Sequence, residues 1–127
     1  MKAILDTHTF LWGIAGDRRM SQKARDVFVG PSDLVLSTAS IWEILIKVQL
    51  RKLSLPEPSG PYVIRKMADN RIETLPIELS HLLAFEGLAL HHRDPFDRML
   101  IAQALEENLP IVTSDPFFSR YPVKVIW

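Results

Sequence analysis

Five short apolar runs separated by helix-like segments constrain the fold of this chain most strongly. The runs, each of a length typical of buried strands, lie at 2–5, 34–37, 72–76, 109–115 and 123–127. Helical patterns lie between them, at 10–15, 21–28, 38–50, 62–70, 80–90 and from 95 onward. Buried strands that alternate with helices are typical of a parallel sheet covered on both faces. We therefore predict an α/β fold, a three-layer α/β/α sandwich around a mostly parallel sheet of four or five strands.

Length and composition indicate the class of protein. The 127 residues suffice for one domain with its own core, and no linker or repeat divides 1–127. The chain has no cysteine, which excludes disulfides and thiolate metal sites. No run approaches the roughly 18 apolar residues of a membrane span, and Asp6 comes too early for a signal peptide. We expect a cytoplasmic protein that does not contact a membrane.

Four acidic residues are expected at one edge of the predicted sheet. In open α/β sheets, ligands bind outside the carboxyl ends of the strands. Asp6 directly follows the first strand, and Asp115 ends the fourth. Glu43 lies about one turn into the helix that leaves the second strand. Asp97 lies in the first turn of the helix before the fourth strand, and that helix must start from the same edge because it runs antiparallel to the strands. The sequence thus predicts that four carboxylates converge.

Each of these acids also has an ordinary structural explanation. Asp115 can simply form a turn. Glu43 can form a surface pair with Lys47 at i+4, a contact that contributes a few tenths of a kcal/mol. Asp94 suits the N-cap of its helix, and Asp97 in the first turn is favourable at the positive end of the helix dipole. At the start of the chain, a helix cap is expected from Thr7 or Thr9.

Convergence would favour a cation site. Two carboxylates about 4 Å apart repel by roughly 4 kcal/mol at an effective dielectric of 20, so a cluster needs protons or a cation. Oxygen ligands with open positions suit Mg²⁺ or Mn²⁺, which activate water and stabilise charge on phosphate oxygens. The chain has 15 basic and 15 acidic residues; neutralising four acids leaves 15 basic against 11 acidic, a surface charge of +4. This chemistry points to metal-dependent phosphodiester hydrolysis.

Other catalytic motifs are missing from the sequence. There is neither a glycine-rich phosphate loop nor a G-x-S-x-G nucleophile turn. The four histidines, His8, His81, His91 and His92, are not spaced as a zinc set. We expect His91 and His92 to line a loop rather than to take part in catalysis.

Four motifs in order resemble the PIN domain family, in particular its VapC-type toxins. They are Ile4-Leu5-Asp6-Thr7-His8, Ser40-Ile41-Trp42-Glu43-Ile44 with Lys47, the segment 93–104 containing Arg93-Asp94-Pro95-Phe96-Asp97-Arg98, and Val112-Thr113-Ser114-Asp115. The resemblance covers essentially the whole chain. It implies a Mg²⁺- or Mn²⁺-dependent endoribonuclease with RNA as substrate, a toxin held inactive by a small antitoxin protein, and a homodimer.

The resemblance also implies which residues act. The catalytic and metal-binding acids are Asp6, Glu43, Asp97 and Asp115. Asp6 and Asp97 are expected to contact the metal directly, Asp115 directly or through water, and Glu43 to bind the metal or orient the attacking water. Possible auxiliary residues are Thr7 and Ser114 beside the metal, Lys47 beside Glu43, Arg93 and Arg98 for substrate phosphates, and Asp94 as a cap or an extra ligand.

Two other functions remain open. The first is a catalytically silent PIN-fold module that binds protein or RNA. The second is an acidic-pocket phosphatase or phosphotransfer domain, although a phosphatase of this kind expects Asp-x-Asp after the first strand, where this chain has Asp6-Thr7-His8. Phe10, Trp12 and Trp42 are expected in the core, and apolar surface between the early helices is expected to receive an antitoxin helix.

Overall fold

A five-stranded parallel sheet forms the centre of the computed structural model, which describes residues 1–127. The strand order is β3-β2-β1-β4-β5, and every neighbouring pair is parallel. The strands are β1 (Lys2–Leu5), β2 (Asp33–Ser37), β3 (Ile72–Leu75), β4 (Ile111–Val112) and β5 (Val125–Ile126). The predicted α/β fold with a parallel sheet is confirmed, although the fourth strand is much shorter than 109–115.

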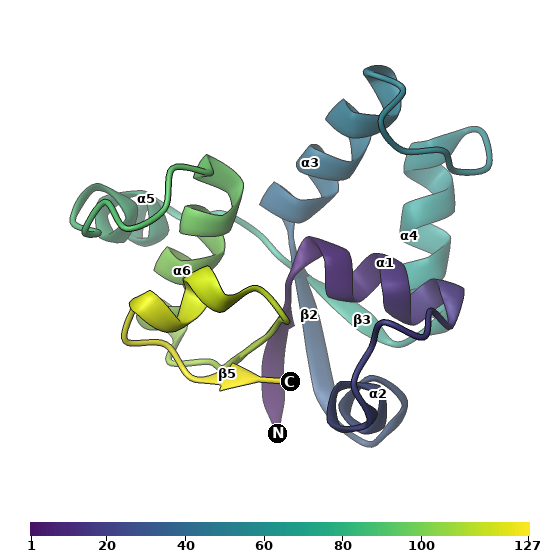
Figure 1. Cartoon of the computed structure of the whole chain (residues 1–127). Helices are drawn as coiled ribbons and strands as arrows, with labels where there is room; N and C mark the ends of the chain where they lie inside the picture. The colour runs from purple at the N-terminus through teal and green to yellow at the C-terminus, as the bar shows by residue number, and fades with distance from the viewer.

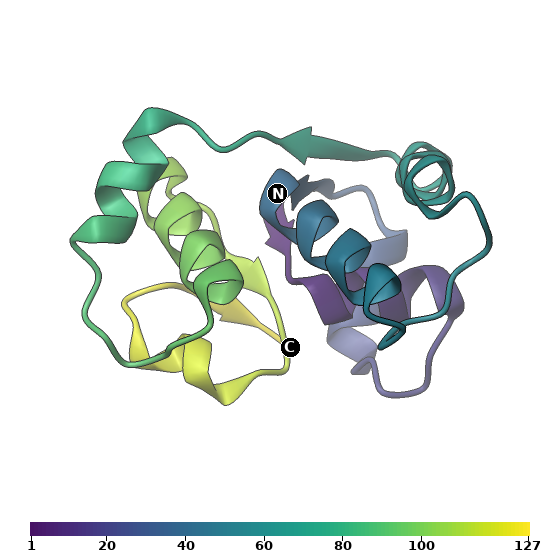
Figure 2. The same ribbon diagram turned by 90° about the horizontal axis from the view of Figure 1, so that it is seen from above.

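Helices cover both faces of this sheet. They are α1 (Thr7–Ala15), α2 (Gln22–Val29), α3 (Thr38–Gln49), α4 (Ser59–Asp69), α5 (Leu79–Glu86), α6 (Pro95–Glu107) and the 3₁₀ helix η1 (Pro116–Arg120). In Figures 1 and 2, α1 to α4 lie on one side of the sheet, and α5, α6 and η1 lie on the other. None of the helices is long and apolar enough to cross a membrane.

Alternate strand residues bury into different layers because successive side chains of a strand point to opposite faces. In β1, Ala3 and Leu5 join a core that contains Phe10 of α1 and Ile44 of α3. The residue between them, Ile4, joins a separate core on the other face, formed with α6 and η1. All five of these side chains are fully buried. Because helices cover both faces of β1, its sequence is a continuous apolar run rather than an alternation of apolar and polar residues.

The order in which the chain adds strands to the sheet reverses at β1. It runs outward from β1 to β2 and β3, then returns through α5 and α6 to place β4 on the opposite side of β1. Ligands of open α/β sheets bind at such a switch point, outside the carboxyl ends of the two strands. The register pairs Leu5 with Val112, so the residues that follow β1 and β4 emerge next to each other.

The three aromatic residues expected in the core differ in burial. Phe10 is completely buried, Trp12 is half-buried, and Trp42 is 61% exposed. The expectation for Trp42 is therefore wrong. Trp42 of α3 contacts Phe96 of α6; the two rings are nearly perpendicular, at 78°, with a centroid distance of 5.4 Å.

Candidate functional site

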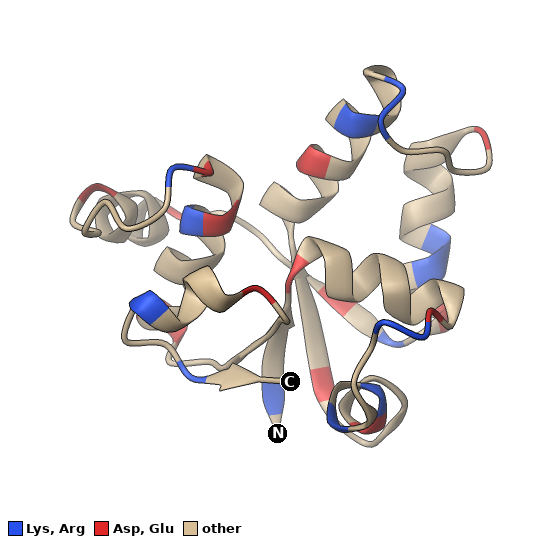
Figure 3. Ribbon diagram, in the orientation of Figure 1, with Lys and Arg blue, Asp and Glu red and all other residues tan.

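The four predicted acids come from four separate elements around the carboxyl edge of β1 and β4. Asp6 follows β1, Glu43 lies in α3, Asp97 lies in the first turn of α6, and Asp115 precedes η1. Figure 3 shows acidic segments at the end of β1, on α3 and at the start of α6, with basic segments nearby on α3 and α6. The sheet topology delivers all of them to the same region, as the switch-point rule requires.

Asp6 is the most deeply buried of the four acids. Its side chain is 4% exposed; Oδ1 accepts a hydrogen bond from the Thr9 backbone N–H at 2.7 Å, and Oδ2 accepts one from the Thr113 hydroxyl. Asp6 itself therefore caps α1, and the expectation of Thr7 or Thr9 as the cap is wrong. The Thr113 hydroxyl also accepts a hydrogen bond from the Asp115 backbone N–H at 3.1 Å, so one side chain connects two of the predicted acids.

Glu43 is held from both sides. It is 6% exposed, and its Oε1 lies 2.8 Å from Thr7 Oγ1, which donates to it. Its Oε2 lies 3.0 Å from the ammonium nitrogen of Lys47, one turn later on α3. Because Thr7 directly follows Asp6, this contact joins α3 to the end of β1. Both carboxylate oxygens of Glu43 thus have partners, and its charge is balanced by Lys47.

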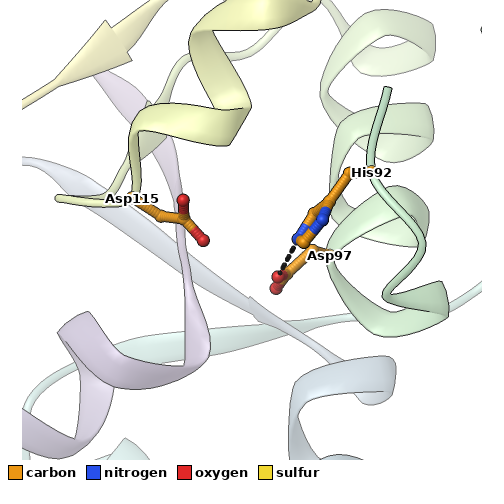
Figure 4. Close-up of side chains that lie close together, drawn as sticks. All are labelled: His92, Asp97 and Asp115. Atoms are coloured by element: carbon orange, nitrogen blue, oxygen red, sulfur yellow. Dashed lines mark hydrogen bonds and ion pairs between the residues drawn. The ribbon is translucent and has the colours of Figure 1, made fainter. Parts of the chain in front are cut away.

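Asp97 and Asp115 lie close together, with His92 beside them. The His92 Nε2 atom lies 2.9 Å from Asp97 Oδ2. One ligand atom from each of His92, Asp97 and Asp115 falls within 4.8 Å of the other two. Figure 4 shows the three side chains pointing toward one another from the loop before α6, the first turn of α6 and the segment before η1.

Electrostatics at Asp97 favour a proton or a cation. Burial, with the neighbouring charges of Asp94 and Glu43, raises the pKa of Asp97 from 3.8 to about 7, against the opposing hydrogen bond from His92. Asp94 serves as the N-cap of α6, where its Oδ1 accepts from the backbone N–H groups of Phe96 at 2.8 Å and Asp97 at 3.1 Å. The cap that starts the helix therefore also places a second negative charge beside Asp97.

The pKa of Asp6 is also raised. Burial is the main cause, and the hydrogen bonds from Thr113 and Thr9 act in the opposite direction. Burial thus disfavours the ionised form of both carboxylates, and at Asp97 the negative charges of Asp94 and Glu43 add to this effect. Carboxylate oxygens are the ligands that suit a hard divalent cation such as Mg²⁺ or Mn²⁺.

The remaining auxiliary residues differ in exposure and in the contacts they make. Arg93 is exposed in the loop before α6, and Ser114 is exposed after β4. The Arg98 guanidinium lies 4.5 Å from the centre of the Phe85 ring, and its Nη2 donates to the Leu88 carbonyl at 3.4 Å. Those contacts occupy Arg98 on the α5 side of α6, so a phosphate contact from it stays a prediction.

Two residues at the site were not predicted from the sequence. The resemblance points to Ser114 rather than to its neighbour Thr113, because the strand register that sets Thr113 beside Asp6 cannot be read from one sequence. The sequence predicts only a loop position for His92. It does lie in the loop between α5 and α6, but its ring reaches Asp97 five residues later. A histidine just before an Asp-Pro helix start was the available signal.

Comparison with known proteins places the chain in a family and finds one relative by sequence over part of its length. The sequence model of the PIN domain matches residues 3–124. Ribonuclease VapC16 of Mycobacterium tuberculosis (strain ATCC 25618 / H37Rv) is 44% identical over 50 residues, which are 39% of this chain and 34% of that protein. This similarity therefore spans about a third of the length of that relative.

Two solved structures share the fold. VapBC2 from Rickettsia felis, solved bound to a DNA fragment from the promoter, has a TM-score of 0.68 at 15% identity, covering 98% of this chain and 97% of the other. VapBC-5 from Mycobacterium tuberculosis, a member of a toxin–antitoxin family, has a TM-score of 0.64 at 18% identity, covering 98% and 94%. At these identities the likeness shows the fold alone.

Proposed function

The chain belongs to the PIN domain family, and on this premise we propose that it is a Mg²⁺- or Mn²⁺-dependent endoribonuclease acting as the toxin of a toxin–antitoxin pair. The observation that carries the proposal is that four acids from four elements lie around one edge of the sheet, where Asp97 and Asp115 offer ligand atoms within 4.8 Å of each other. Burial raises the pKa of Asp6 and of Asp97, and the charges of Asp94 and Glu43 raise that of Asp97 further, so a cation bound here would favour the ionised carboxylates. The ribonuclease similarity to VapC16 supports RNA as the substrate.

We assign the metal to Asp6, Asp97 and Asp115. Asp97 and Asp115 offer oxygens within 4.8 Å of each other, and Asp6 is connected to Asp115 through the hydroxyl of Thr113. A divalent cation bound here would activate water and stabilise the charge that develops on the phosphate oxygens. Its positive charge would also favour the ionised form of Asp97, whose pKa is raised mainly by burial and further by the charges of Asp94 and Glu43.

Glu43 and its partners orient the reactants in this proposal. Thr7 and Lys47 fix both oxygens of its carboxylate, so the side chain cannot turn away from the region. From that position Glu43 accepts a hydrogen bond from the attacking water. Lys47 keeps this region from becoming still more negative as an RNA phosphate approaches. Arg93, exposed in the loop before α6, is free to meet a neighbouring phosphate.

A groove beside the site fits the proposed antitoxin. It has a volume of about 550 Å³ and lies between α1, the end of α3 and the start of α4. Its apolar lining comes mainly from Leu11, Trp12, Ile14, Leu53, Leu55 and Tyr62. The groove also reaches Lys47, the partner of Glu43. An amphipathic helix of an antitoxin bound in this groove would lie next to the acids. The complexes VapBC2 and VapBC-5 are the relatives that support such a partner.

The proposed homodimer has a candidate surface on α5. Leu79 and Leu83 of this helix are largely exposed, as is Leu90 in the loop that follows. Exposed leucines gathered on one short helix are typical of a surface covered by another chain. A second copy of the chain is the partner we assign to it.

The experiment that tests the proposal is RNA cleavage by the purified chain with and without a chelator. We expect cleavage in Mg²⁺ or Mn²⁺, loss of cleavage in EDTA, and recovery when the ion is restored. Asp6→Asn and Asp97→Asn should each abolish cleavage while leaving the circular dichroism spectrum unchanged. Asp33→Asn, at an exposed position that begins β2, is the matched control and should cleave normally.

The outcomes separate the proposal from its alternatives. Cleavage that persists in EDTA would remove the metal from the mechanism. Full activity in either site variant would remove that residue. RNA binding without cleavage in any ion would favour the silent binding module, and release of phosphate from a monoester without RNA cleavage would favour the phosphatase.

A further inference from the structure

We propose that Nε2 of His92 is an additional ligand of the metal ion and makes the site prefer Mn²⁺ to Mg²⁺. This inference rests on the proposed metal site and adds to it a residue that the acid motifs do not include. It follows from the position of the His92 ring, from how the ring is held, and from the chemistry of imidazole.

The position of the ring matches two neighbouring ligands of one ion. Ligands about 2.1 Å from an octahedral ion lie about 3.0 Å apart when adjacent and about 4.2 Å apart when opposite. His92 Nε2 and Asp97 Oδ2 are 2.9 Å apart, which is the adjacent spacing. The Oδ1 atom of Asp115 accepts from the Phe117 backbone N–H at 2.9 Å, which leaves the other carboxylate oxygen of Asp115 for an ion. The three ligand atoms lie within 4.8 Å of one another, so a movement of roughly 0.6 Å or less brings them to octahedral spacing.

The ring of His92 is fixed by contacts on the side away from Asp97. It stacks on the Phe117 ring with a centroid distance of 4.9 Å and an angle of 5° between the planes. Its backbone N–H donates to the hydroxyl of Tyr121 at 3.1 Å. Tyr121 is buried, and its hydroxyl donates to the Ala89 carbonyl at 2.7 Å. Two contacts with distant parts of the chain, Phe117 and Tyr121, thus hold this loop residue, as is usual for a ligand and unusual for a side chain that only lines a loop.

The stacked partner also connects His92 to Asp115. Phe117 lies two residues after Asp115, in the first turn of η1. Asp115 begins that helix as its N-cap, so the orientation of Phe117 and that of Asp115 are set by the same turn. His92 and Asp115 therefore keep a fixed relation to each other, which is what two ligands of one ion require.

Imidazole changes which ion the site prefers. Mg²⁺ is bound mainly through carboxylates, phosphates and water, whereas imidazole nitrogen suits later divalent metals and is accepted by Mn²⁺ more readily than by Mg²⁺. In the absence of an ion, the Nε2–H tautomer donates to Asp97. Binding an ion requires the other neutral tautomer, with its proton on Nδ1. The site then has one nitrogen ligand among its oxygens.

The test is pulsed electron paramagnetic resonance on the full chain loaded with Mn²⁺ alone. Nitrogen bound to Mn²⁺ produces ¹⁴N modulation, which oxygen ligands do not. We compare the unmodified chain, His92→Gln, and the control His91→Gln, which changes the exposed neighbouring histidine. Titration calorimetry on the same three proteins measures the Kd for Mn²⁺ and for Mg²⁺. A fourth sample, with histidine labelled with ¹⁵N, needs no substitution.

We expect ¹⁴N modulation in the unmodified chain and in His91→Gln, its loss in His92→Gln, and its replacement by ¹⁵N signals in the labelled chain. The Kd for Mn²⁺ should rise at least about 10-fold in His92→Gln, because removing even a residue that only hydrogen-bonds to a metal ligand weakens metal binding by about 10–100-fold. The Kd for Mg²⁺ should change less than about 3-fold. Bound Mn²⁺ without nitrogen modulation, or modulation that persists in His92→Gln, overturns this inference and leaves the nuclease proposal intact. Failure of the unmodified chain to bind Mn²⁺ or Mg²⁺ overturns both.

Discussion

Replacing Asp97 by Asn should stabilise the metal-free protein at pH 8 while abolishing its activity. The folded chain holds this carboxyl group with a pKa of about 7, against 3.8 for the ordinary group. Burial is the main cause, and the charges of Asp94 and Glu43 add to it. The ionised side chain therefore opposes folding at neutral and alkaline pH, and an amide of the same shape removes that opposition.

The magnitude follows from the two pKa values. One pKa unit equals about 1.4 kcal/mol, so the difference between 3.8 and about 7 corresponds to about 4 kcal/mol. The amide must also be buried, which offsets part of the gain, so we expect Asp97→Asn to add about 2–4 kcal/mol to the free energy of unfolding. Asn keeps an oxygen that accepts the hydrogen bond from His92.

The sign of the pH dependence is also fixed. A carboxyl group with a raised pKa in the folded state contributes stability at low pH and loses it as the pH rises from about 4 to about 7. The difference between Asp97→Asn and the unmodified chain should therefore be small at pH 4, increase to pH 7 and stay constant above it. The raised pKa of Asp6 affects both proteins equally and cancels in the difference.

The assay is urea unfolding in EDTA at pH 4, 6 and 8. The exposed control, Asp33→Asn, should change the free energy of unfolding by less than about 0.5 kcal/mol. Added Mg²⁺ or Mn²⁺ should stabilise the unmodified chain and have less effect on Asp97→Asn. The reasoning is refuted if Asp97→Asn is no more stable than the unmodified chain at pH 8, or if its advantage is the same at pH 4 and pH 8.

Substitutions at three further residues test the connections around the site. Thr113→Val removes the hydroxyl that donates to Asp6; thermal unfolding at pH 7 should show a loss of about 1–3 kcal/mol, and a neutral result would mean that this hydrogen bond is not maintained in solution. Tyr121→Phe removes the hydroxyl that holds the backbone of His92, so hydrogen exchange of that amide should accelerate at least about 10-fold, equivalent to about 1.4 kcal/mol; unchanged exchange would exclude this restraint. Asp94→Ala should cost about 0.5–2 kcal/mol as a lost helix cap, and Asp94→Asn should restore most of it in urea unfolding; equal losses in both would argue against capping as the cause.

The placement of the acids was predictable because it depends on topology rather than on detailed packing. In a parallel sheet, the residues that follow the strands share an edge, so Asp6 and Asp115 could be located once the strands were recognised. The Asp94-Pro95 pair predicted the start of α6, and the structure has Asp94 as its N-cap. Asp97 then falls in the first turn, at the same edge.

The contacts that complete the site depend on packing between segments distant in sequence. The hydrogen bond between Asp6 and Thr113 spans 107 residues and follows from the register of β1 and β4. The position of His92 depends on Tyr121, 29 residues later. No periodicity or spacing in one sequence contains this information. The exposure of Trp42 has the same origin, because which side of α3 faces the core is set by the layers on either side.

The most direct test of the account is a crystal structure of the chain grown with Mn²⁺, measured for anomalous scattering. The account predicts an anomalous peak about 2.0–2.5 Å from carboxylate oxygens of Asp6 and Asp97, with Asp115 nearby. It is contradicted if Mn²⁺ binds elsewhere, or if no peak forms between β1 and α6 at concentrations that support RNA cleavage.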